Sequence, residues 1–323
     1  MRAVVRDRYG SPEVLKSAEL PKPAPGGGEV LIRVRAASVN AGDWRILRAD
    51  PFLIRLMGYG LLTPRHPVLG QDVAGQVEAI GAGVTQFRPG DEVFGESPDG
   101  GAFAEFVCAP AAQLAPKPAS LSFEQAAAVP LAAVTALRGL RLAGPLQRGQ
   151  TVLVNGASGG VGTFAVQIAR ALGAEVTGVC STRNVDLVRS IGARRVIDYT
   201  REDFTRNGRA YDRILNAAAY RSIFEYRRAL RPGGAYVHIG GSTARMFEVL
   251  LLGPVASRGG SGRFQFLASE TTTEDLVYLT DLLEAGKVVP VIDRRYALPD
   301  VPDALRYLET GRARGKVVVT LAA

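Results

Sequence analysis

The clearest chemical signature in this chain is a group of glycines that follows an apolar segment at Thr151–Val154. Gly156–Gly162 reads Gly-Ala-Ser-Gly-Gly-Val-Gly and leads into apolar residues at helical spacing. This is the G-x-G-x-x-G pattern of dinucleotide-binding turns, with Ala157 in its first place. Gly159 would let the backbone approach a pyrophosphate, and Gly162 would let the helix pack on its strand. A ligand-free strand–helix turn is the alternative. We expect these residues to contact a dinucleotide: Ser158, Gly159, Gly160, Val161 and Gly162.

The end of the next expected strand, Val176–Cys180, indicates which dinucleotide is bound. NAD-binding domains usually carry Asp or Glu about 20 residues after the glycine turn, where it binds the ribose 2′-hydroxyl. Here Ser181 and Arg183 follow the strand, and no acid stands at its tip. A carboxylate would repel a 2′-phosphate, whereas these two side chains can hydrogen-bond and neutralise it. We therefore predict NADPH as the cofactor, with a solvated surface arginine as the alternative reading.

Between residues 122 and 266, segments of strand and helix character alternate. Such repeated β–α units predict a parallel sheet covered by helices, a doubly wound Rossmann domain. Its strands are expected at Thr151–Val154, Val176–Cys180, Arg195–Ile197, Arg213–Asn216 and Ala235–Ile239. We expect this sheet to be full by about residue 240. Asn216 and Gly240 end strands at the carboxyl edge, so both are expected to contact the cofactor.

The first third of the chain has short strand-like segments bounded by glycine or proline, which predicts a compact β-rich, barrel-like domain. These strands are expected at Val30–Arg35, Val73–Ile80, Asp91–Phe94 and Phe103–Cys108. The tail has helical patterns at Thr273–Ala285 and Asp300–Thr310 and a last strand at Lys316–Leu321, and is expected to complete the first domain. The predicted domains are residues 1–121 with 267–323, and residues 122–266.

Composition narrows the classes of partner. Lys and Arg number 39 against 31 Asp and Glu, a formal net charge of +8, but the arginines are spread without basic blocks, so we expect no nucleic-acid partner. Met1–Asp7 is charged where a secretory segment is apolar. The longest apolar stretch, Ala126–Leu137, is shorter than the roughly 20 residues that cross a bilayer. The only two cysteines, Cys108 and Cys180, give no disulfide framework. We expect a cytoplasmic protein without a membrane partner.

Taken together, these segments resemble the medium-chain dehydrogenase/reductase superfamily, and most of all its quinone oxidoreductase (zeta-crystallin-like) branch. The order and spacing of the segments, more than any single one, carry the resemblance over essentially the whole chain. They are Ala36–Asp43, Pro67–Gly75, Gly90–Gly95, Ala126–Pro130, Ala157–Gly162, Val196–Tyr199 and Gly315–Val319. The resemblance implies a GroES-like catalytic domain beside a Rossmann domain, an active site between them, and a homodimer. A strand near Phe264–Phe266 is expected to extend the Rossmann sheet across the dimer interface.

Zinc-dependent members of that superfamily carry Cys and His ligands in the first domain, and this sequence departs from that pattern. Ser38–Asp43 contains no cysteine, Gly70–Asp72 reads Gly-Gln-Asp in place of Gly-His-Glu, and the four-cysteine lobe is absent. Tetrahedral zinc needs several N or S ligands, and the two histidines, His66 and His238, lie in different domains. We expect no metal site.

Without zinc, the expected chemistry is hydride transfer from NADPH to an acceptor that is already electron-poor. A quinone or an α,β-unsaturated carbonyl fits this description, so an enone or enoyl reductase is expected, with a hydrophobic substrate. The protein would position the two partners and stabilise the developing oxyanion. A zinc-free alcohol dehydrogenase and a non-catalytic nucleotide sensor or crystallin-like protein are the alternatives.

The resemblance also implies roles for individual residues. Asn40 and Thr135 would line the nicotinamide end of the site, where Asn40 could donate an amide hydrogen or simply cap a loop. Tyr199 would stack near the adenosine phosphate, and Lys316 would reach the cofactor from the last strand. Asp43 is expected to cap a helix.

Tyr59 lies in an apolar insert, Phe52–Leu62, that borders the substrate pocket in the family. It could donate a proton or a hydrogen bond to the substrate. The alternative is a loop or helix packed on the barrel, and an exposed insert could equally cover a partner surface.

Overall fold

The chain folds into two compact units. The computed structural model describes residues 1–258, 262–268 and 270–321. One unit comprises 1–132, 271–284 and the chain from 290 onward, and the second comprises 133–270 and 285–289. Residues 122–132, assigned to the second domain from the sequence, group with the first unit. The reason is that α2 (Phe123–Ala127) packs against β3 and β4 (Glu29–Val39 and Asp72–Ile80).

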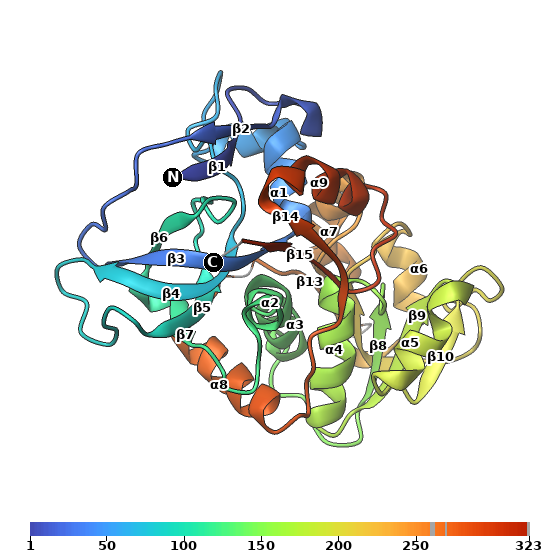
Figure 1. Cartoon of the computed structure of the whole chain (residues 1–323). Coiled ribbons are helices and arrows are strands. Elements are labelled where there is room, and N and C mark those ends of the chain that lie inside the picture. Colours follow the sequence, from blue (N-terminus) through green and yellow to red (C-terminus); the bar gives the residue numbers. More distant parts are fainter. Residues whose placement is uncertain (259–261, 269, 322–323) are drawn as a thin grey trace. The chain divides into compact units, whose positions relative to one another are not determined.

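A seven-stranded sheet is the main element of the first unit among its described residues (Figure 1). Its order is β14-β15-β3-β4-β5-β7, with β6 also paired to β3. The pairs are antiparallel except β14–β15. A separate hairpin joins β1 (Arg2–Val5) to β2 (Lys16–Glu19). The remaining strands of the large sheet are β5 (Glu92–Glu96), β6 (Phe106–Pro110), β7 (Leu114–Pro116), β14 (Ile292–Ala297) and β15 (Lys316–Thr320).

Close strand packing and amphipathic helices complete the first unit. A Cβ on Gly75 of β4 would stand 2.1 Å from the Arg33 carbonyl oxygen, so only glycine lets β3 and β4 approach there. In α9 (Val301–Glu309), the buried residues Val301, Ala304 and Leu305 recur at helical spacing and face β15 and α1 (Ala41–Arg48). The other elements are η1 (Pro12–Val14), η2 (Phe52–Leu56), η3 (Ala111–Gln113), η6 (Leu298–Asp300) and α8 (Thr273–Glu284).

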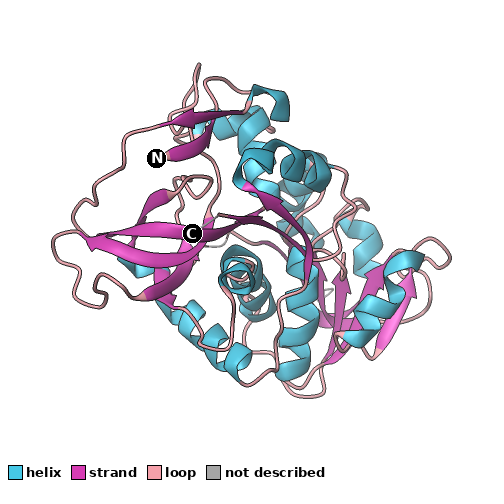
Figure 2. Cartoon of the chain, viewed as in Figure 1, coloured by secondary structure: helices cyan, strands magenta, loops and turns pink. Residues whose placement is uncertain are grey.

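The second unit is built on a parallel sheet of order β10-β9-β8-β11-β12-β13. Val152, Leu153 and Val154 of β8 are all fully buried, as strands covered on both faces require. Helices pack beside these strands (Figure 2). The strands are β8 (Thr151–Asn155), β9 (Glu175–Cys180), β10 (Arg195–Asp198), β11 (Tyr211–Asn216), β12 (Leu230–His238) and β13 (Arg263–Phe266). The helices are α4 (Gly160–Ala171), η4 (Thr182–Asn184), α5 (Val185–Ser190), α6 (Ile223–Arg228) and α7 (Thr243–Ala256), with α3 (Pro130–Arg141) leading in from the first unit.

The predicted fold class is confirmed: a GroES-like β-rich unit and a Rossmann unit. The predicted strands are present with small shifts of their ends. Ser122 caps α2, and its side chain accepts from the Gln125 amide. The expectation that the Rossmann sheet is full at residue 240 was wrong. After β12 the chain passes through α7 and adds β13 in parallel beside β12, so β13 becomes the edge strand. Among the described residues, no helix is both long and apolar enough to cross a membrane.

Candidate active site

In the second unit, the glycine turn connects the buried strand β8 to helix α4. Gly159 is the residue before the helix, and the amide of Thr163 donates to its carbonyl oxygen at 2.9 Å. The amides of Gly160, Val161 and Gly162 come before that first helical bond, so they have no acceptor inside the helix. These amides and the positive end of the helix dipole make a site for an anion such as a pyrophosphate.

The glycines of this turn serve two different purposes. A Cβ on Gly162 would lie 2.0 Å from the Gly156 carbonyl oxygen and 2.8 Å from Cα of Ala157, so the turn itself excludes a side chain there. A Cβ on Gly159 would meet only the Gly156 oxygen, at an ordinary 3.5 Å. The fold therefore requires glycine at 162, whereas at 159 the absent side chain leaves room above the helix end.

Asn184 ties the glycine turn to the tip of β9. Its Nδ2 donates to Ser158 Oγ at 2.9 Å and to Ser181 Oγ at 3.4 Å, and its side chain is buried. Arg183 is exposed one residue earlier in η4. The structure thus brings Ser158, Ser181 and Arg183, predicted separately from the sequence, to one edge of the sheet. Asn184 was missed because nothing in its local sequence shows that it reaches back to the turn.

An acid that sequence reasoning did not consider lies near this tip. Asp198 ends β10 beside the end of β9, and its carboxylate accepts from Thr182 Oγ1 at 2.5 Å and from Thr200 Oγ1 at 2.7 Å. The Thr182 hydrogen bond is the main cause that lowers the pKa of Asp198. The neighbouring Tyr199 side chain is 54% exposed. The hydroxyls therefore hold an anionic carboxylate in place beside the expected adenosine site.

Beneath the carboxyl edge of the sheet lies a buried polar network. Asn155 Nδ2 donates to Asn216 Oδ1 at 2.8 Å and to the Tyr226 hydroxyl at 3.0 Å. Asn216 Nδ2 in turn donates to the Tyr236 hydroxyl at 2.7 Å. Asn216 is fully buried, so its side chain holds neighbouring strands together and its cofactor contact stays a prediction. Gly240 follows β12, where a Cβ would lie 3.2 Å from the Ala217 carbonyl oxygen.

In the first unit, a cluster of buried polar side chains centres on Asp72, at the start of β4. Its Oδ2 accepts from Ser38 Oγ at 2.6 Å, from Asn40 Nδ2 at 2.9 Å and from Lys316 Nζ at 3.1 Å. Its Oδ1 accepts from the amide of Leu131 at 2.9 Å. Lys316 Nζ also donates to Asn40 Oδ1. Four donors on one carboxylate satisfy a charge that has no access to water.

This cluster fixes the orientation of the Asn40 side chain. Lys316 and Asp72 are 2% and 0% exposed, so neither charge can be solvated if the other is lost. The Asn40 oxygen binds the ammonium and one amide hydrogen binds the carboxylate, which leaves the second amide hydrogen as a donor. The structure thus brings together Asn40 and Lys316, two predicted residues separated by nearly the whole chain.

Asp43 is a second buried carboxylate beside this cluster. Its Oδ2 accepts from the Asn40 amide at 2.7 Å and its Oδ1 from the Gly70 amide at 3.2 Å, so its expected role in capping α1 is confirmed. Burial raises the pKa of Asp43 to about 7, and the charge of Asp72 adds to this effect. The proximity of Lys316 opposes the rise. Asp43 therefore exchanges its proton near neutral pH.

Tyr59 lies close to Asp43. Both residues, with Arg6 and Gln71, line a small cavity of about 10 Å³, the space of about one water. Burial raises the pKa of Tyr59 and lowers that of Arg6 to about 10. The structure therefore places Tyr59 beside Asp43, while Phe52 and Leu56 of the nearby η2 are 60% and 62% exposed.

Thr135 lies in the second unit, on α3, and is buried. Its predicted place beside the nicotinamide stays a prediction. So do the predicted cofactor contacts of Tyr199 and Lys316.

Known proteins share the sequence features and the fold of this chain. Residues 26–119 match the alcohol dehydrogenase GroES-like domain family, and residues 191–319 match the zinc-binding dehydrogenase family. The 2-methylene-furan-3-one reductase of Solanum lycopersicum is 36% identical over 99% of this chain and 79% of its own. The mitochondrial NAD(P)H oxidoreductase RTN4IP1 of Mus musculus is 34% identical over 99% and 89%. The solved quinone oxidoreductase of Coxiella burnetii superposes with a TM-score of 0.88 at 30% identity, over 100% of this chain and 99% of that one.

The chain belongs to the quinone oxidoreductase branch of the medium-chain dehydrogenase/reductases. It is therefore an oxidoreductase, and the resemblance found in the sequence is confirmed. Because relatives are named NAD(P)H oxidoreductases, the glycine turn of the second unit is the candidate site for a nicotinamide cofactor. Family membership also makes the polar cluster of the first unit the candidate for substrate contact.

One of the two family matches is named for zinc, so the donor set of this oxidoreductase must be tested against that ion. Asn40, Gln71 and Asp72 stand in the segments where zinc-dependent relatives carry their ligands by the resemblance described above. The Lys316 ammonium already binds both Asn40 and Asp72, and a second cation there would meet its charge directly. No group of three His, Cys, Asp or Glu side chains in the described part of the chain could hold a metal ion. These residues do not fit zinc.

Proposed function

We propose that this oxidoreductase is a zinc-independent, NADPH-dependent reductase that transfers hydride to a quinone or an α,β-unsaturated carbonyl. The observation that carries the proposal is the buried cluster of Asn40, Asp72 and Lys316. It orients one neutral amide donor, and its carboxylate already binds the Lys316 ammonium in place of a metal cation. A neutral donor suits an acceptor that needs its developing oxyanion stabilised but needs no Lewis acid to become reactive.

NADPH, when bound, supplies the hydride. Ser158 and the amides at the start of α4 would hold its pyrophosphate, while Ser181 and Arg183 would hold the 2′-phosphate. Asn40 would donate its remaining amide hydrogen to the substrate oxygen. Lys316 and Asp72 keep that amide from rotating, and Tyr59 with Asp43 lies close by as a source of a proton. Thr135 would line the nicotinamide pocket.

Cofactor choice is tested by titrating the protein with NADPH and NADH while following nicotinamide fluorescence. In Arg183→Ala the affinity for NADPH should fall roughly ten- to a hundredfold, because a charge-assisted hydrogen bond contributes roughly 1.5–3 kcal/mol, and the affinity for NADH should not change. Arg189→Ala is the matched control, because Arg189 is exposed on the next helix. If Arg183→Ala lowers the affinities for NADPH and NADH equally, or lowers neither, the proposed 2′-phosphate site is contradicted.

Substrate class is tested by adding quinones and enones to the NADPH complex. Oxidation of NADPH that persists after treatment with a strong chelator, in protein that contains no zinc by elemental analysis, is the expected result. Activity that disappears with the chelator and returns with zinc would overturn zinc independence. Tight NADPH binding without turnover of any acceptor would favour a nucleotide sensor instead.

We also propose that the protein forms a homodimer through β13. This strand is the edge of the parallel sheet, and an edge strand presents unpaired backbone groups to another chain. α7 packs beside β13 and exposes apolar side chains, among them Leu251 at 72%. Size-exclusion chromatography with light scattering should give a dimer at micromolar concentration, and a monomer would refute the interface.

A further inference from the structure

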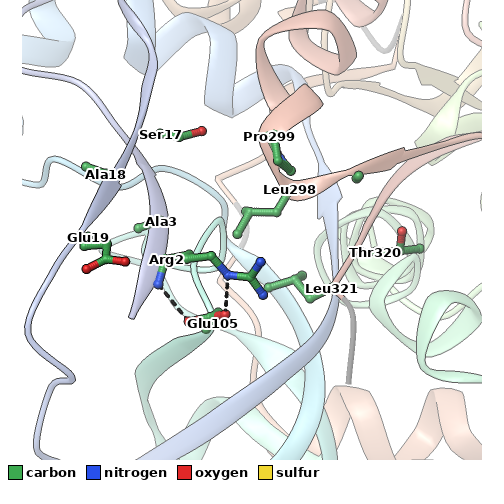
Figure 3. A pocket seen from close by; sticks show the side chains of 11 residues that line it. Arg2, Ala3, Ser17, Ala18, Glu19, Glu105, Leu298, Pro299, Thr320 and Leu321 are labelled. Atoms are coloured by element: carbon green, nitrogen blue, oxygen red, sulfur yellow. Dashed lines mark hydrogen bonds and ion pairs between the residues drawn. The ribbon is translucent and has the colours of Figure 1, made fainter.

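A large cavity in the first unit takes no part in the function proposed above. Its volume is about 490 Å³, within the range of small-molecule sites. It opens between the β1–β2 hairpin, Glu105, η6 and the end of β15 (Figure 3). Lys316 of the polar cluster begins β15, and Thr320 at the cavity ends it, so four residues, or roughly 13 Å of strand, separate the two places. None of the residues that line the cavity belongs to the Asn40 cluster.

Arg2 brings a positive charge to this cavity, and its side chain is 68% exposed. Glu105 Oε1 accepts from Arg2 Nε at 2.7 Å, and Oε2 accepts from the Arg2 backbone amide at 2.7 Å. These two contacts hold the base of the arginine side chain. The hydrogen bond from the Arg2 backbone amide is the main cause that lowers the pKa of Glu105. The two terminal guanidinium nitrogens have no partner among the described residues. A planar pair of such donors matches the two oxygens of a carboxylate.

The rest of the wall is mainly apolar. Leu298 and Leu321 are almost wholly buried and flank the Arg2 guanidinium in Figure 3. Ala3, Ala18 and other small side chains complete the wall. A ligand that fills this space must therefore pair an anionic end with an apolar body.

Two other charges lie close to Arg2. The Met1 ammonium donates to the Leu20 carbonyl oxygen at 2.7 Å and helps to lower the pKa of Glu105. The Met1 ammonium therefore partly balances the negative charge of Glu105, which Arg2 also binds. Glu19 is exposed at the rim, and in Figure 3 its carboxylate points away from Leu298 and Leu321. Among the described residues that line the cavity, Arg2 is therefore the one positively charged side chain that an anion could bind.

We propose that this cavity is a second ligand site, for an amphipathic monocarboxylate. The carboxylate binds the terminal nitrogens of Arg2, and the hydrocarbon part packs against Leu298 and Leu321. The proposal stands independently of NADPH binding and of the reductase activity.

Isothermal titration calorimetry with decanoate and with decylammonium, which share one chain length but carry opposite charges, tests this site. Decanoate should bind one site with a Kd on the order of 0.1–1 mM, a reasonable value for a ligand of this size, and decylammonium should not bind. Arg2→Met should weaken decanoate binding about tenfold or more. Arg8→Met removes the same charge from an exposed arginine that does not line the cavity, and should leave the affinity unchanged.

A second variant tests the apolar part of the cavity. Ala18→Trp should abolish decanoate binding by filling the space between the hairpin and Leu298. Circular dichroism and thermal unfolding check that each variant is folded, and Arg2→Met should be, because exposed ion pairs contribute little to stability. Equal binding of both probes, unchanged affinity in Arg2→Met and Ala18→Trp, or no heat with decanoate would each overturn the proposal.

Discussion

The polar cluster of the first unit and the glycine turn of the second achieve specificity in opposite ways. The cluster relies on side chains that are buried and paired with one another: Asn40, Asp72 and Lys316 come from positions far apart in the sequence. The turn relies on backbone amides and on the absence of side chains, within the seven consecutive residues Gly156–Gly162. The cluster is therefore sensitive to the loss of a charge, and the turn to the gain of an atom.

The largest effect is expected when the cluster loses its cation. Lys316→Met leaves the Asp72 carboxylate buried without its counter-ion, and breaking such a pair costs about 3–5 kcal/mol of unfolding free energy. Urea denaturation should show this loss. The double variant Lys316→Met/Asp72→Asn removes both charges and should recover much of the stability, but not the full activity, because Asn40 loses its fixed orientation.

A stable Lys316→Met single variant would show that Asp72 is protonated or hydrated in its place. Failure of the double variant to recover stability would show instead that packing of the lysine stem, more than its charge, supports the cluster.

The turn is tested by a matched pair of glycine variants. Gly162→Ala forces a methyl group against the Gly156 carbonyl oxygen and should cost about 3 kcal/mol of stability. Gly159→Ala adds the same methyl group where the fold has space, so its stability should stay close to the wild type. Its affinity for NADPH should nevertheless fall, because the methyl group stands where a pyrophosphate must approach. Thermal unfolding and fluorescence titration separate the two effects. Normal NADPH binding by Gly159→Ala would place the phosphates elsewhere.

The sequence predicts the glycine turn better than it predicts the polar cluster. The glycine turn, the parallel strands and the residues after β9 were predictable because each depends on neighbours in the chain. Asp72 and Ser38, by contrast, carried no local signal, because their meaning depends on Lys316, which pairs with Asp72 across 244 positions. Asn184 was missed for a similar reason, because it reaches back to Ser158. The strand at Phe264–Phe266 was predicted, but its parallel pairing beside β12 contradicts the expectation that the sheet is full by residue 240.

Asp43 gives the cluster a pH dependence that the turn lacks. Its pKa of about 7 in the folded protein lies above the ordinary value of about 3.9, so the folded state binds more protons between these pH values. The contribution of Asp43 to stability is therefore fully present below about pH 4 and is lost as the pH rises toward 7. The groups that face it are Asp72, Lys316, Arg6 and Tyr59.

Between pH 5 and 7 the free energy of unfolding should fall by about 2 kcal/mol at most through Asp43. In Asp43→Asn this part of the pH dependence should be absent. Urea denaturation of both proteins across this range measures the difference. Asp43→Asn is expected to be less stable at every pH, because its side-chain amide cannot accept from both backbone donors. The test is therefore the slope of unfolding free energy against pH, and not its absolute value. Parallel pH profiles of the two proteins would show that Asp43 does not titrate there.

The smallest expected effect concerns the acid beside the turn. Thr182→Val removes the hydroxyl that donates to Asp198 Oδ2, while Thr200 still binds Oδ1. One carboxylate oxygen therefore loses this partner close to the proposed 2′-phosphate site. One neutral hydrogen bond contributes about 1 kcal/mol, so the preference for NADPH over NADH should fall roughly three- to fivefold without any loss of stability. Thr182→Ser keeps the donor and is the control. If both variants keep the wild-type ratio of the two affinities, Asp198 lies out of reach of the phosphate. Cofactor choice would then rest on Ser181 and Arg183 alone.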